Sequence, residues 1–536
     1  MEHLERLSRE KDLPGMPSVR QEFAETFFKR LESAGETLPT WEGELYLEKH
    51  QGTYTTQSEN KRNNRLCERE LHALEFLGAA ASCLCPGYEW RSGDVGKIWE
   101  KVLLYQFHDI LPGSAIDRVY AETDESYAEL LESIGRLKEE ALEALRKAPG
   151  TKPVPSLMNP APSENGDPVP ENGFLRPAAP ALPYCFTEFR PLRENGRSTL
   201  RSESDVLEND RLLVRFSEKG TLLSVFDKRR REETLSGESN RLLVYPDLCD
   251  GWEVPDALES PAQEELTPVS CACGLAGETA FRVYEYKYRD SAVRQTVRLS
   301  AGSARIEWET EIDWKEQHTL LRAEFSPAVA AESAVCGVPF GELPRPTMHR
   351  DSWEAAKREV CFQGYCDLSD GVRGCAVLSD CRYGIDVRDC RLSLALLRTP
   401  TFPAAHADLG RHLLAYAFLP HAGGTDEVRP ESFRMRAPSV PLAFLPPLTE
   451  PFARAEGLLV SAIKPAEDGD GIVVRFYNPT GRAGKTAIRF APSLGIVSCF
   501  SANLLEEPVA ELPPGRELNF GPFEIITVRG KRKKEK

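Results

Sequence analysis

His108 and Asp109 stand out as neighbouring residues whose side chains could do chemistry. They follow an apolar-periodic segment that predicts a helix, and the helix-stopping pair Pro112-Gly113 comes three residues later. An imidazole is a common metal ligand, and a carboxylate beside it can hold a metal ion or a hydroxyl group. At the end of a helix, beside a turn, such side chains can reach into a cleft. The spacing alone also fits a more common alternative, a buried histidine bonded to a backbone carbonyl.

The spacing of the other possible ligands does not complete a metal site. A catalytic zinc needs three protein ligands and an open position for water or substrate. The sequence has no HExxH motif and no two histidines four residues apart. His406-Ala-Asp408 has an HxD spacing, but it lies in a loop rich in proline and alanine, where a surface turn is expected.

Length and composition indicate a folded, multidomain protein. The chain has 536 residues, of which 41% are apolar and 28% are charged, so we expect two to four domains. The net charge of -16 argues against attraction to nucleic acid or to an anionic membrane surface. We therefore expect neither a nucleic-acid partner nor a membrane partner.

The location of the protein is predicted from its N-terminus and its apolar stretches. The first eleven residues are charged throughout and form no apolar leader. The longest apolar stretch, around residues 74–85, is too short to span a bilayer. The fourteen cysteines include no CxxC pair, so reduced thiols are expected. These features predict a cytoplasmic protein.

Residues 1–150 are predicted to be helical. The clearest helix is expected from about residue 118 to residue 147, where apolar side chains recur every three or four residues, and Pro149-Gly150 ends the pattern. Similar spacing is found around residues 66–77 and 98–110. Three helices that share a core would form a bundle of about 100 residues.

The rest of the chain is predicted to be rich in strands. Residues 151–208 are expected to form a loop-rich, proline-rich linker with the entry strands of the next domain. Residues 209–435 show the period-two alternation of a large antiparallel β-sandwich, for example at residues 212–216 and 306–314. Residues 436–530 are expected to form a small C-terminal β domain, and residues 531–536 a basic tail. The predicted fold class is α+β multidomain, with a three-helix bundle followed by large antiparallel β-sandwich domains.

Several motifs, in the same order along the chain, resemble those of one enzyme family. They cover nearly the whole sequence: Trp41-Glu-Gly-Glu-Leu-Tyr-Leu-Glu-Lys-His-Gln-Gly-Thr-Tyr54, Lys61-Arg62-Asn-Asn-Arg65, Gln106-Phe-His108-Asp109-Ile-Leu-Pro-Gly-Ser114, Phe340-Gly-Glu-Leu-Pro-Arg-Pro-Thr347, Leu392-Ser-Leu-Ala-Leu-Leu-Arg398-Thr-Pro400 and Ala407-Asp408-Leu-Gly410. They are similar to the bacterial α-mannosidases of glycoside hydrolase family 38. The matching segments are the central and C-terminal portion of that family.

This resemblance implies a function for four residues. His108 matches a zinc-ligating histidine, although another divalent cation is an alternative. Asp109 matches a carboxylate that binds mannose hydroxyls, and Tyr54 matches an aromatic residue that lines the sugar subsite. Asp408 lies in a loop that resembles one closing over the active site, so it is also expected to bind substrate. Gln51 and Leu409 replace an arginine and a glutamine that are usual in the family, which leaves the linkage preference open.

The same resemblance implies that the catalytic carboxylates lie outside this chain. Retaining hydrolysis needs a nucleophile and an acid/base carboxyl group about 5 Å apart. In the family both come from an N-terminal barrel, so we assign no catalytic residue here. The expected function is retaining, metal-dependent hydrolysis of terminal α-mannosides in oligosaccharides, carried out together with a companion barrel polypeptide. The alternatives are a non-catalytic carbohydrate-binding or assembly module and an inert, aggregation-prone remnant.

Two structural expectations follow from the absence of the barrel. The helical region before residue 150 should expose an apolar face larger than monomers usually show. His108 and Asp109 should lie on the same exposed rim as Tyr54.

Overall fold

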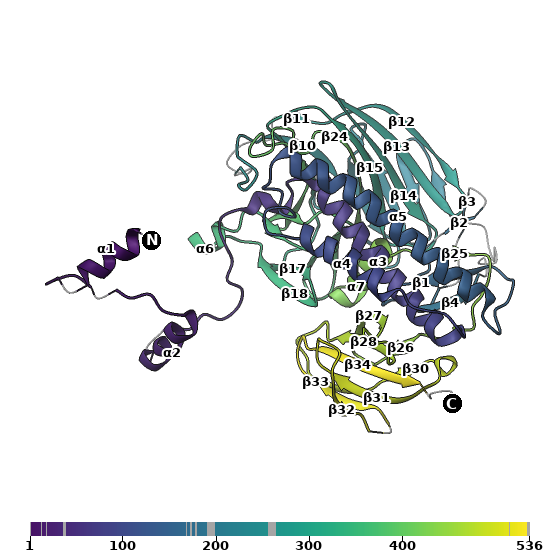
Figure 1. Ribbon diagram of the computed structural model, residues 1–536. Coiled ribbons are helices and arrows are strands. Elements are labelled where there is room, and N and C mark those ends of the chain that lie inside the picture. The colour runs from purple at the N-terminus through teal and green to yellow at the C-terminus, as the bar shows by residue number, and fades with distance from the viewer. Residues whose placement is uncertain are drawn as a thin grey trace. The chain divides into compact units, whose positions relative to one another are not determined.

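The computed structural model (Figure 1) describes residues 2–11, 13–17, 19–35, 39–167, 169–171, 174–176, 180–189, 199–255, 264–513 and 515–532. The chain divides into two compact units, Met1–Leu47 and Glu48–Lys536. The first unit contains the short helices α1 (Glu2–Glu10) and α2 (Ala24–Ala34), neither of which has a buried residue. None of the described helices is long and apolar enough to cross a membrane.

Three long helices of the second unit share one hydrophobic core. They are α3 (Ser58–Leu84), α4 (Ser92–Tyr105) and α5 (Asp117–Lys147), and α5 matches the helix predicted at residues 118–147. Their apolar faces meet because each helix carries apolar residues at three- and four-residue steps. The buried members of this core are Cys67, Leu71, Leu74, Val95, Ile98, Val102, Tyr105, Tyr127, Ile134 and Leu137.

The end of α4 differs from the prediction. The apolar spacing continues to Ile110, but the helix stops at Tyr105, and residues 106–113 form successive turns. Phe107 and Ile110 keep the helical spacing without forming a helix, since Pro112 and Gly113 prevent its continuation. His108 and Asp109 therefore lie in a turn after the helix and not on the helix itself.

The large β region is built from three antiparallel sheets. The nine-stranded sheet has the order β12 (Pro268–Ala276), β13 (Thr279–Tyr288), β14 (Ser291–Ser300), β15 (Ile306–Trp314), β24 (Gly410–His421), β21 (Gly374–Ser379), β20 (Tyr365–Ser369), β17 (Ser333–Val338), β18 (Gly341–Pro346). The six-stranded sheet has the order β11 (Glu264–Glu265), β10 (Arg241–Pro246), β16 (Thr319–Phe325), β23 (Arg391–Arg398), β22 (Gly384–Arg388), β19 (Val360–Cys361). The five-stranded sheet runs β5 (Arg201–Ser202), β6 (Val206–Glu208), β7 (Leu212–Phe216), β8 (Leu222–Asp227), β9 (Glu232–Glu233).

Aromatic residues join the two largest sheets face to face. Trp308 of β15 and Phe325 of β16 come from different sheets, and their rings are 5.7 Å apart in an edge-to-face arrangement. Phe325 also stacks on Phe418 of β24 at 5.5 Å. Along β15 the buried residues alternate with more exposed ones, as predicted for residues 306–314. The two sheets therefore pack as a β-sandwich.

The remaining elements are small. They are η1 (Gln51–Tyr54), β1 (Ser156–Asn159), β2 (Val169–Glu171), β3 (Phe174–Arg176), β4 (Cys185–Glu188), α6 (Ser352–Ala355), α7 (Thr425–Arg436) and β25 (Val440–Leu442). Strands β1 to β6 fall within residues 151–208, the segment predicted as a linker, and its residues 168, 172–173, 177–179 and 190–198 lie outside the described part.

The C-terminal strands pack on the second half of α3. They are β26 (Ala453–Arg454), β27 (Leu459–Pro465), β28 (Ile472–Tyr477), β29 (Gly484–Ala487), β30 (Arg489–Phe490), β31 (Ile496–Ala502), β32 (Pro508–Glu511), β33 (Glu517–Phe520) and β34 (Ile525–Arg532), with η2 (Pro492–Leu494). Lys531 and Arg532 of the predicted basic tail end β34, and residues 533–536 lie outside the described part.

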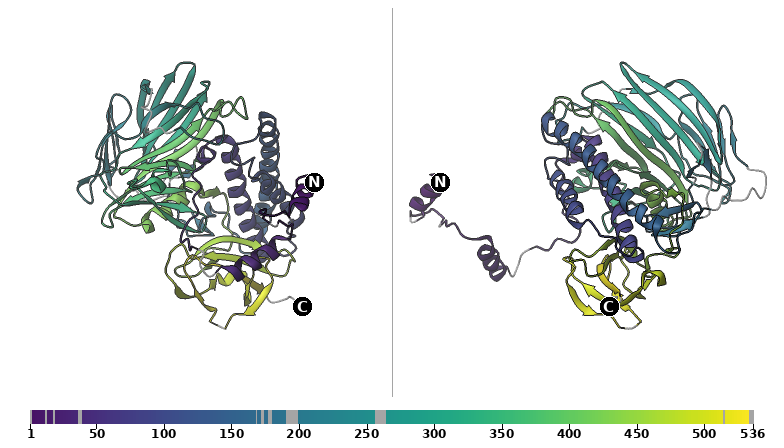
Figure 2. Two further views of the ribbon diagram at one scale, coloured as in Figure 1. Left: turned by 90° about the vertical axis from the view of Figure 1, so that its left-hand side faces the viewer. Right: turned by 45° about the vertical axis from the view of Figure 1, so that its right-hand side comes forward.

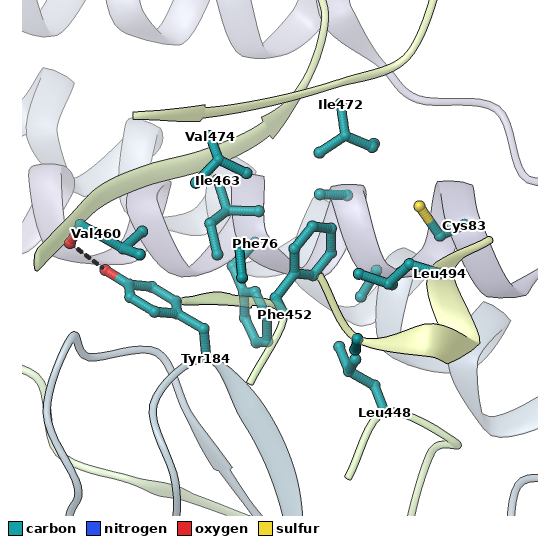
Figure 3. Close-up of a cluster of buried hydrophobic side chains, with 14 of the residues drawn as sticks. Phe76, Cys83, Tyr184, Leu448, Phe452, Val460, Ile463, Ile472, Val474 and Leu494 are labelled. Atoms are coloured by element: carbon teal, nitrogen blue, oxygen red, sulfur yellow. Dashed lines mark hydrogen bonds between the residues drawn. The ribbon is translucent and has the colours of Figure 1, made fainter. Parts of the chain in front are cut away.

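A shared core holds α3 against these strands (Figure 3). Phe76 is fully buried, and its ring lies 6.2 Å from that of Phe452 and 5.7 Å from that of Tyr184. The Tyr184 hydroxyl donates to the Val460 carbonyl at 3.2 Å. Both views of Figure 2 show α3, α4 and α5 beside the large β region, with the C-terminal strands at one end of these three helices. Helix α3 thus connects the two β parts of the unit.

Glu75 of α3 predicts a pH dependence of stability. Its side chain accepts a hydrogen bond from the Trp99 indole at 2.9 Å, and burial raises its pKa from 4.5 to about 7. The stabilising effect of the bound proton is complete below pH 4.5 and is lost as the pH rises to about 7. At about 1.4 kcal/mol per pH unit, the loss is about 3 kcal/mol. Glu75→Gln keeps the acceptor and removes the titration, so its melting temperature should rise relative to the parent between pH 4.5 and pH 8.

Calorimetry across this pH range checks the prediction. Glu139→Gln on the exposed face of α5 is the matched control, and its difference from the parent should stay constant. An equally constant difference for Glu75→Gln would show that folding does not change the pKa of the Glu75 carboxyl.

Candidate functional site

Four segments of the second unit meet around the start of α3. They are residues 50–58, 108–116, 247–255 and 400–409, and we call them the rim. Gly52 N donates to the Trp252 carbonyl at 2.8 Å, and Gly251 N donates to the Phe402 carbonyl at 2.7 Å. The backbone of Gly113 passes so close to Thr56 that a Cβ on Gly113 would lie 2.5 Å from the Thr56 carbonyl oxygen. Each predicted site residue lies on one of these segments.

His108 and Asp109 are accessible from solvent. Their side chains are 77% and 53% exposed, and His108 Nε2 lies 3.6 Å from Asp109 Oδ2. The Phe107 ring lies 4.2 Å from the imidazole, centre to centre. The Asp109 carboxylate is 3.4 Å from the Ser114 hydroxyl. The imidazole is therefore not the buried, carbonyl-bonded histidine of the alternative interpretation, and both side chains can be reached from solvent.

The chemistry of this pair fits a metal site, but the number of ligands does not complete one. Among the described residues, no three His, Cys, Asp or Glu side chains lie close enough together to hold a metal ion. A catalytic zinc takes three protein ligands. His108 can supply one nitrogen donor, and the other donors would have to come from another polypeptide segment.

Lys61 connects the turn that carries His108 to the segment that carries Tyr54. Its ammonium group is buried and donates to the carbonyls of Thr56, Leu111 and Pro112 at 2.5, 2.8 and 3.2 Å. Burial lowers the pKa of Lys61 to about 7, and the nearby Asp408 opposes this effect. Tyr54 is the last residue of η1 and is half-buried. The structure brings the two segments together, and a joint role of these residues in sugar binding stays a prediction.

Asp408, from a loop remote in sequence, binds the N-terminal N–H groups of α3. Its carboxylate is buried and accepts from Gln57 N at 2.8 Å, from Ser58 N at 2.7 Å and from the Ser58 hydroxyl at 2.7 Å. A carboxylate at this position satisfies free N–H groups and interacts favourably with the helix dipole. These bonds already engage both carboxylate oxygens. A direct contact of Asp408 with sugar stays a prediction.

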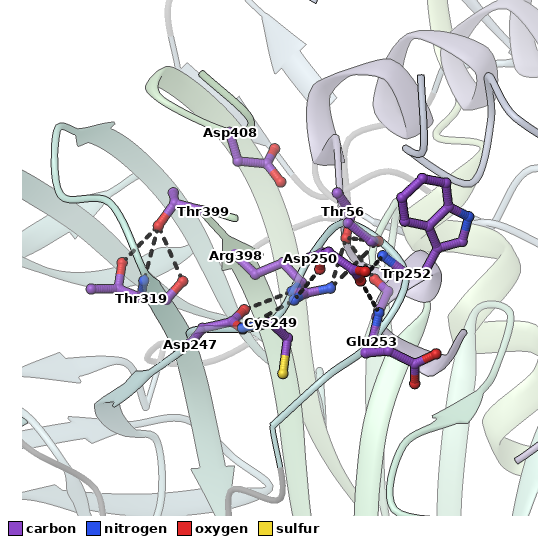
Figure 4. A network of polar contacts seen from close by, with 12 residues as sticks. Thr56, Asp247, Cys249, Asp250, Trp252, Glu253, Thr319, Arg398, Thr399 and Asp408 are labelled. Atoms are coloured by element: carbon purple, nitrogen blue, oxygen red, sulfur yellow. Dashed lines mark hydrogen bonds and ion pairs between the residues drawn. The ribbon is translucent and has the colours of Figure 1, made fainter. Parts of the chain in front are cut away.

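Arg398 holds the rim together from within, a role that no sequence motif predicted. The Arg398 and Asp247 side chains are both fully buried and form a two-pronged ion pair of 2.8 and 3.1 Å (Figure 4). The same guanidinium donates to the Thr56 hydroxyl at 3.1 Å and to the Asp250 carbonyl at 2.9 Å. The only sequence signal was an arginine ending the apolar run of residues 392–397. Its role depends on three partners distant in sequence.

Gln51, one of the departures from the family pattern, is also structural. It is buried, its amide donates to the Ala356 carbonyl at 2.7 Å, and its oxygen accepts from Glu359 N at 3.0 Å. Next to it, a Cβ on Gly52 would lie 1.9 Å from the Arg398 guanidinium, so this position requires glycine. The start of η1 is thus fixed to the β region by polar contacts.

Apolar side chains are exposed beside His108. Leu103, Leu104, Phe107 and Ile116 are each more than half exposed, although they flank the turn at the end of a well-packed helix. Water contact with so many large apolar groups in one place is unfavourable. These four exposed side chains are the candidates for the predicted apolar face before residue 150, and its size stays a prediction.

Comparisons with protein families match most of this unit. The "Alpha mannosidase middle domain" matches residues 48–145, the "Glycosyl hydrolases family 38 C-terminal domain" matches residues 207–406, and the "Glycosyl hydrolases family 38 C-terminal beta sandwich domain" matches residues 457–528. All four predicted site residues except Asp408 fall within these ranges. Met1–Leu47, the first unit, lies before all three.

Known relatives agree with these matches. "Alpha-mannosidase 2C1" of Homo sapiens is 31% identical over 98% of this chain and 54% of its own length. "Alpha-mannosidase G" of Dictyostelium discoideum is 27% identical over 98% of this chain and 56% of its own length. The chain thus spans about half the length of these curated relatives. The crystal structure of an α-mannosidase from Enterococcus faecalis shares the fold, with a TM-score of 0.80 and 16% identity over 97% of this chain and 73% of the solved one.

Proposed function

Because this chain belongs to glycoside hydrolase family 38, of which it carries the middle and C-terminal domains, we propose that it is part of an α-mannosidase active site. The proposed reaction is retaining, metal-dependent hydrolysis of terminal α-mannosides in oligosaccharides. The observation that supports it best is the exposed pair His108 and Asp109, which lies on the rim beside apolar side chains that a second polypeptide segment would cover.

Each predicted residue has a proposed role. His108 would supply one ligand of a zinc ion or another divalent cation, which stabilises developing negative charge and orients the substrate when bound. Asp109 would accept hydrogen bonds from mannose hydroxyls, and Tyr54 would line the sugar subsite. Asp408 would act indirectly by holding the start of α3, where Tyr54 is attached. A cytoplasmic location is part of this proposal.

The two catalytic carboxyl groups are proposed to come from the family's N-terminal barrel. Retaining hydrolysis needs a nucleophile and an acid/base group about 5 Å apart. The exposed side chains of Leu103, Leu104, Phe107 and Ile116 are the proposed contact surface for that barrel. Burial of these apolar groups would provide the driving force for assembly, at about 25 cal/mol per Å².

Hydrolysis of p-nitrophenyl α-mannoside with added zinc tests the proposal. The chain alone should be inactive, and the chain mixed with a separately expressed barrel polypeptide should be active. Phe107→Lys should lower the activity of the mixture, whereas Val509→Lys, at a position on β32 that is still more exposed (72% against 51%), should not. Activity of the chain alone would mean that the nucleophile lies within it, and inactivity of both samples would overturn the proposed function.

A further inference from the structure

The two edges of the nine-stranded sheet are unlike each other. Edge strand β18 contains Pro344 and Pro346 and the charged residues Glu342 and Arg345. Proline and charge at a sheet edge are features that prevent pairing with a further strand. The opposite edge strand, β12, has nine residues, Pro-Val-Ser-Cys-Ala-Cys-Gly-Leu-Ala, none of which is charged. After its first residue it contains no proline.

The other sheet edges in the described part of the chain are short or protected. The six-stranded sheet ends in β11 and β19, which have two residues each. The C-terminal sheet has the order β27-β28-β34-β31-β32. Its edge strand β32 has four residues and contains Pro508 and Glu511, and its other edge strand, β27, ends in Lys464 and Pro465 and packs on α3. Strand β12 is about 30 Å long at 3.3 Å per residue. Its register with β13 is irregular between Pro268 and Ser270, and beyond that point residues 270–276 form the long edge without charge or proline that proteins usually avoid.

Strand β12 also carries exposed side chains on the core side of the sheet. Cys271 is paired with Tyr284, Cys273 with Arg282 and Leu275 with Ala280. Side chains that are directly opposite in an antiparallel pair lie on the same face, and these three partners on β13 are buried. The β12 residues are nevertheless exposed, with Leu275 at 56%, and a buried Arg282 nitrogen donates to Cys271 Sγ at 3.1 Å. The row of core-side residues thus continues onto the edge strand β12. There it consists of the exposed residues Cys271, Cys273 and Leu275, which we call the stripe.

We propose that β12 pairs with the β12 of a second copy of this chain, in antiparallel orientation about a two-fold axis at Cys273. In this register Cys273 faces Cys273 of the other copy, and Cys271 faces Leu275. The apolar stripe is then covered by its own equivalent, and no like charges are opposed because the strand has none. The pairing is isologous, so it closes as a dimer and does not extend further. The two nine-stranded sheets become one continuous sheet.

A second copy fits this edge better than an unrelated strand. The three stripe residues 271, 273 and 275 are evenly spaced about Cys273, so the strand is self-complementary in size and polarity. A polar or charged strand would leave the stripe against unpaired charge, which is costly to bury. This inference is independent of the proposed mannosidase activity, because β12 is not part of the rim.

Sedimentation equilibrium of the 536-residue chain tests the dimer. The parent should sediment with twice the mass of one chain. Cys273→Lys places two ammonium groups directly opposite each other and should raise the dimer dissociation constant by more than about tenfold. Val509→Lys, on the protected edge of the C-terminal sheet, should leave the dimer unchanged. A parent with the mass of one chain, or a Cys273→Lys variant that dimerises as well as the parent, would overturn the proposal.

Oxidative cross-linking tests the register without relying on a destabilising change. Opposite residues of an antiparallel pair have Cα atoms about 4.5–5.5 Å apart, within the range of a disulfide. Diamide, which accepts the two hydrogens released by two thiols, should therefore link the parent into a covalent dimer through Cys273. Cys271→Ser should still be linked at the parent's yield, and Cys273→Ser should lose at least nine-tenths of it. Equal yields in both variants would contradict pairing at Cys273.

Discussion

His108→Ala is expected to lower kcat/KM for p-nitrophenyl α-mannoside by more than about 100-fold in the enzyme assembled with its barrel. Loss of a group that only orients a metal ligand already costs about 10–100-fold, and loss of the ligand itself should cost more. The imidazole is 77% exposed, so its removal leaves no buried cavity and should not change the melting temperature. The assay therefore reports on function and not on folding.

A metal measurement separates this role from other ways of losing activity. Zinc bound per assembled enzyme should fall for His108→Ala. Asp109→Asn should keep the metal and lower kcat/KM, since Asp109 is proposed to bind sugar hydroxyls. His406→Ala is the matched control, because His406 is 74% exposed and lies beside a carboxylate, Asp117 Oδ2, at 3.2 Å. If His108→Ala retains both zinc and activity, His108 is not a metal ligand.

Arg398→Ala is expected to destabilise the folded chain by about 3–5 kcal/mol. It leaves the fully buried Asp247 carboxylate without its cation, and uncompensated buried charges cost this much. It also removes the bonds from Arg398 to Thr56 and to the Asp250 carbonyl, so the rim should loosen. Thermal unfolding measures the first effect, and faster proteolysis within residues 247–255 measures the second.

Two further variants test whether the destabilisation by Arg398→Ala comes from the buried, unpaired charge. Arg398→Met combined with Asp247→Asn removes both charges and should recover part of the stability lost by the single change. Arg294→Ala breaks an exposed ion pair with Glu311 of similar length, 2.9 Å, and should cost less than about 1 kcal/mol. Equal destabilisation by Arg294→Ala and Arg398→Ala would mean that burial does not govern the strength of the Arg398 pair.

The sequence predicted the elements whose patterns are local. Helix α5 and strand β15 were predicted because the spacing of their apolar residues is regular over many residues. The predicted end of α4 was wrong because the apolar spacing continues through Phe107 and Ile110 beyond the helix. Apolar spacing also does not show that the Lys61 ammonium group donates to the carbonyls of the following turn. Local patterns thus predict where an element lies better than where it ends.

The candidate site was predictable only in part. The family motifs contained His108, Asp109, Tyr54 and Asp408, and the structure places them on segments that meet around the start of α3, while a shared binding site stays a prediction. The motifs did not show that the Asp408 carboxylate is bound to backbone N–H groups of α3. The Arg398 pair was also missed, since its meaning comes from Asp247 and Thr56, which are far away in the sequence. Polar contacts between remote segments leave no periodic signal.

The contact of Asp408 with the start of α3 has a consequence for the order of folding. Ser58 and the residue that binds its N–H group, Asp408, are 350 positions apart. During synthesis, the first turn of α3 leaves the ribosome long before Asp408 exists, and contacts over such distances form slowly because chain entropy must first be lost. We therefore expect the helices to form a core early and the rim to become ordered last, after the sandwich has folded. A chain interrupted before residue 408 would keep its helical core and lack an ordered rim.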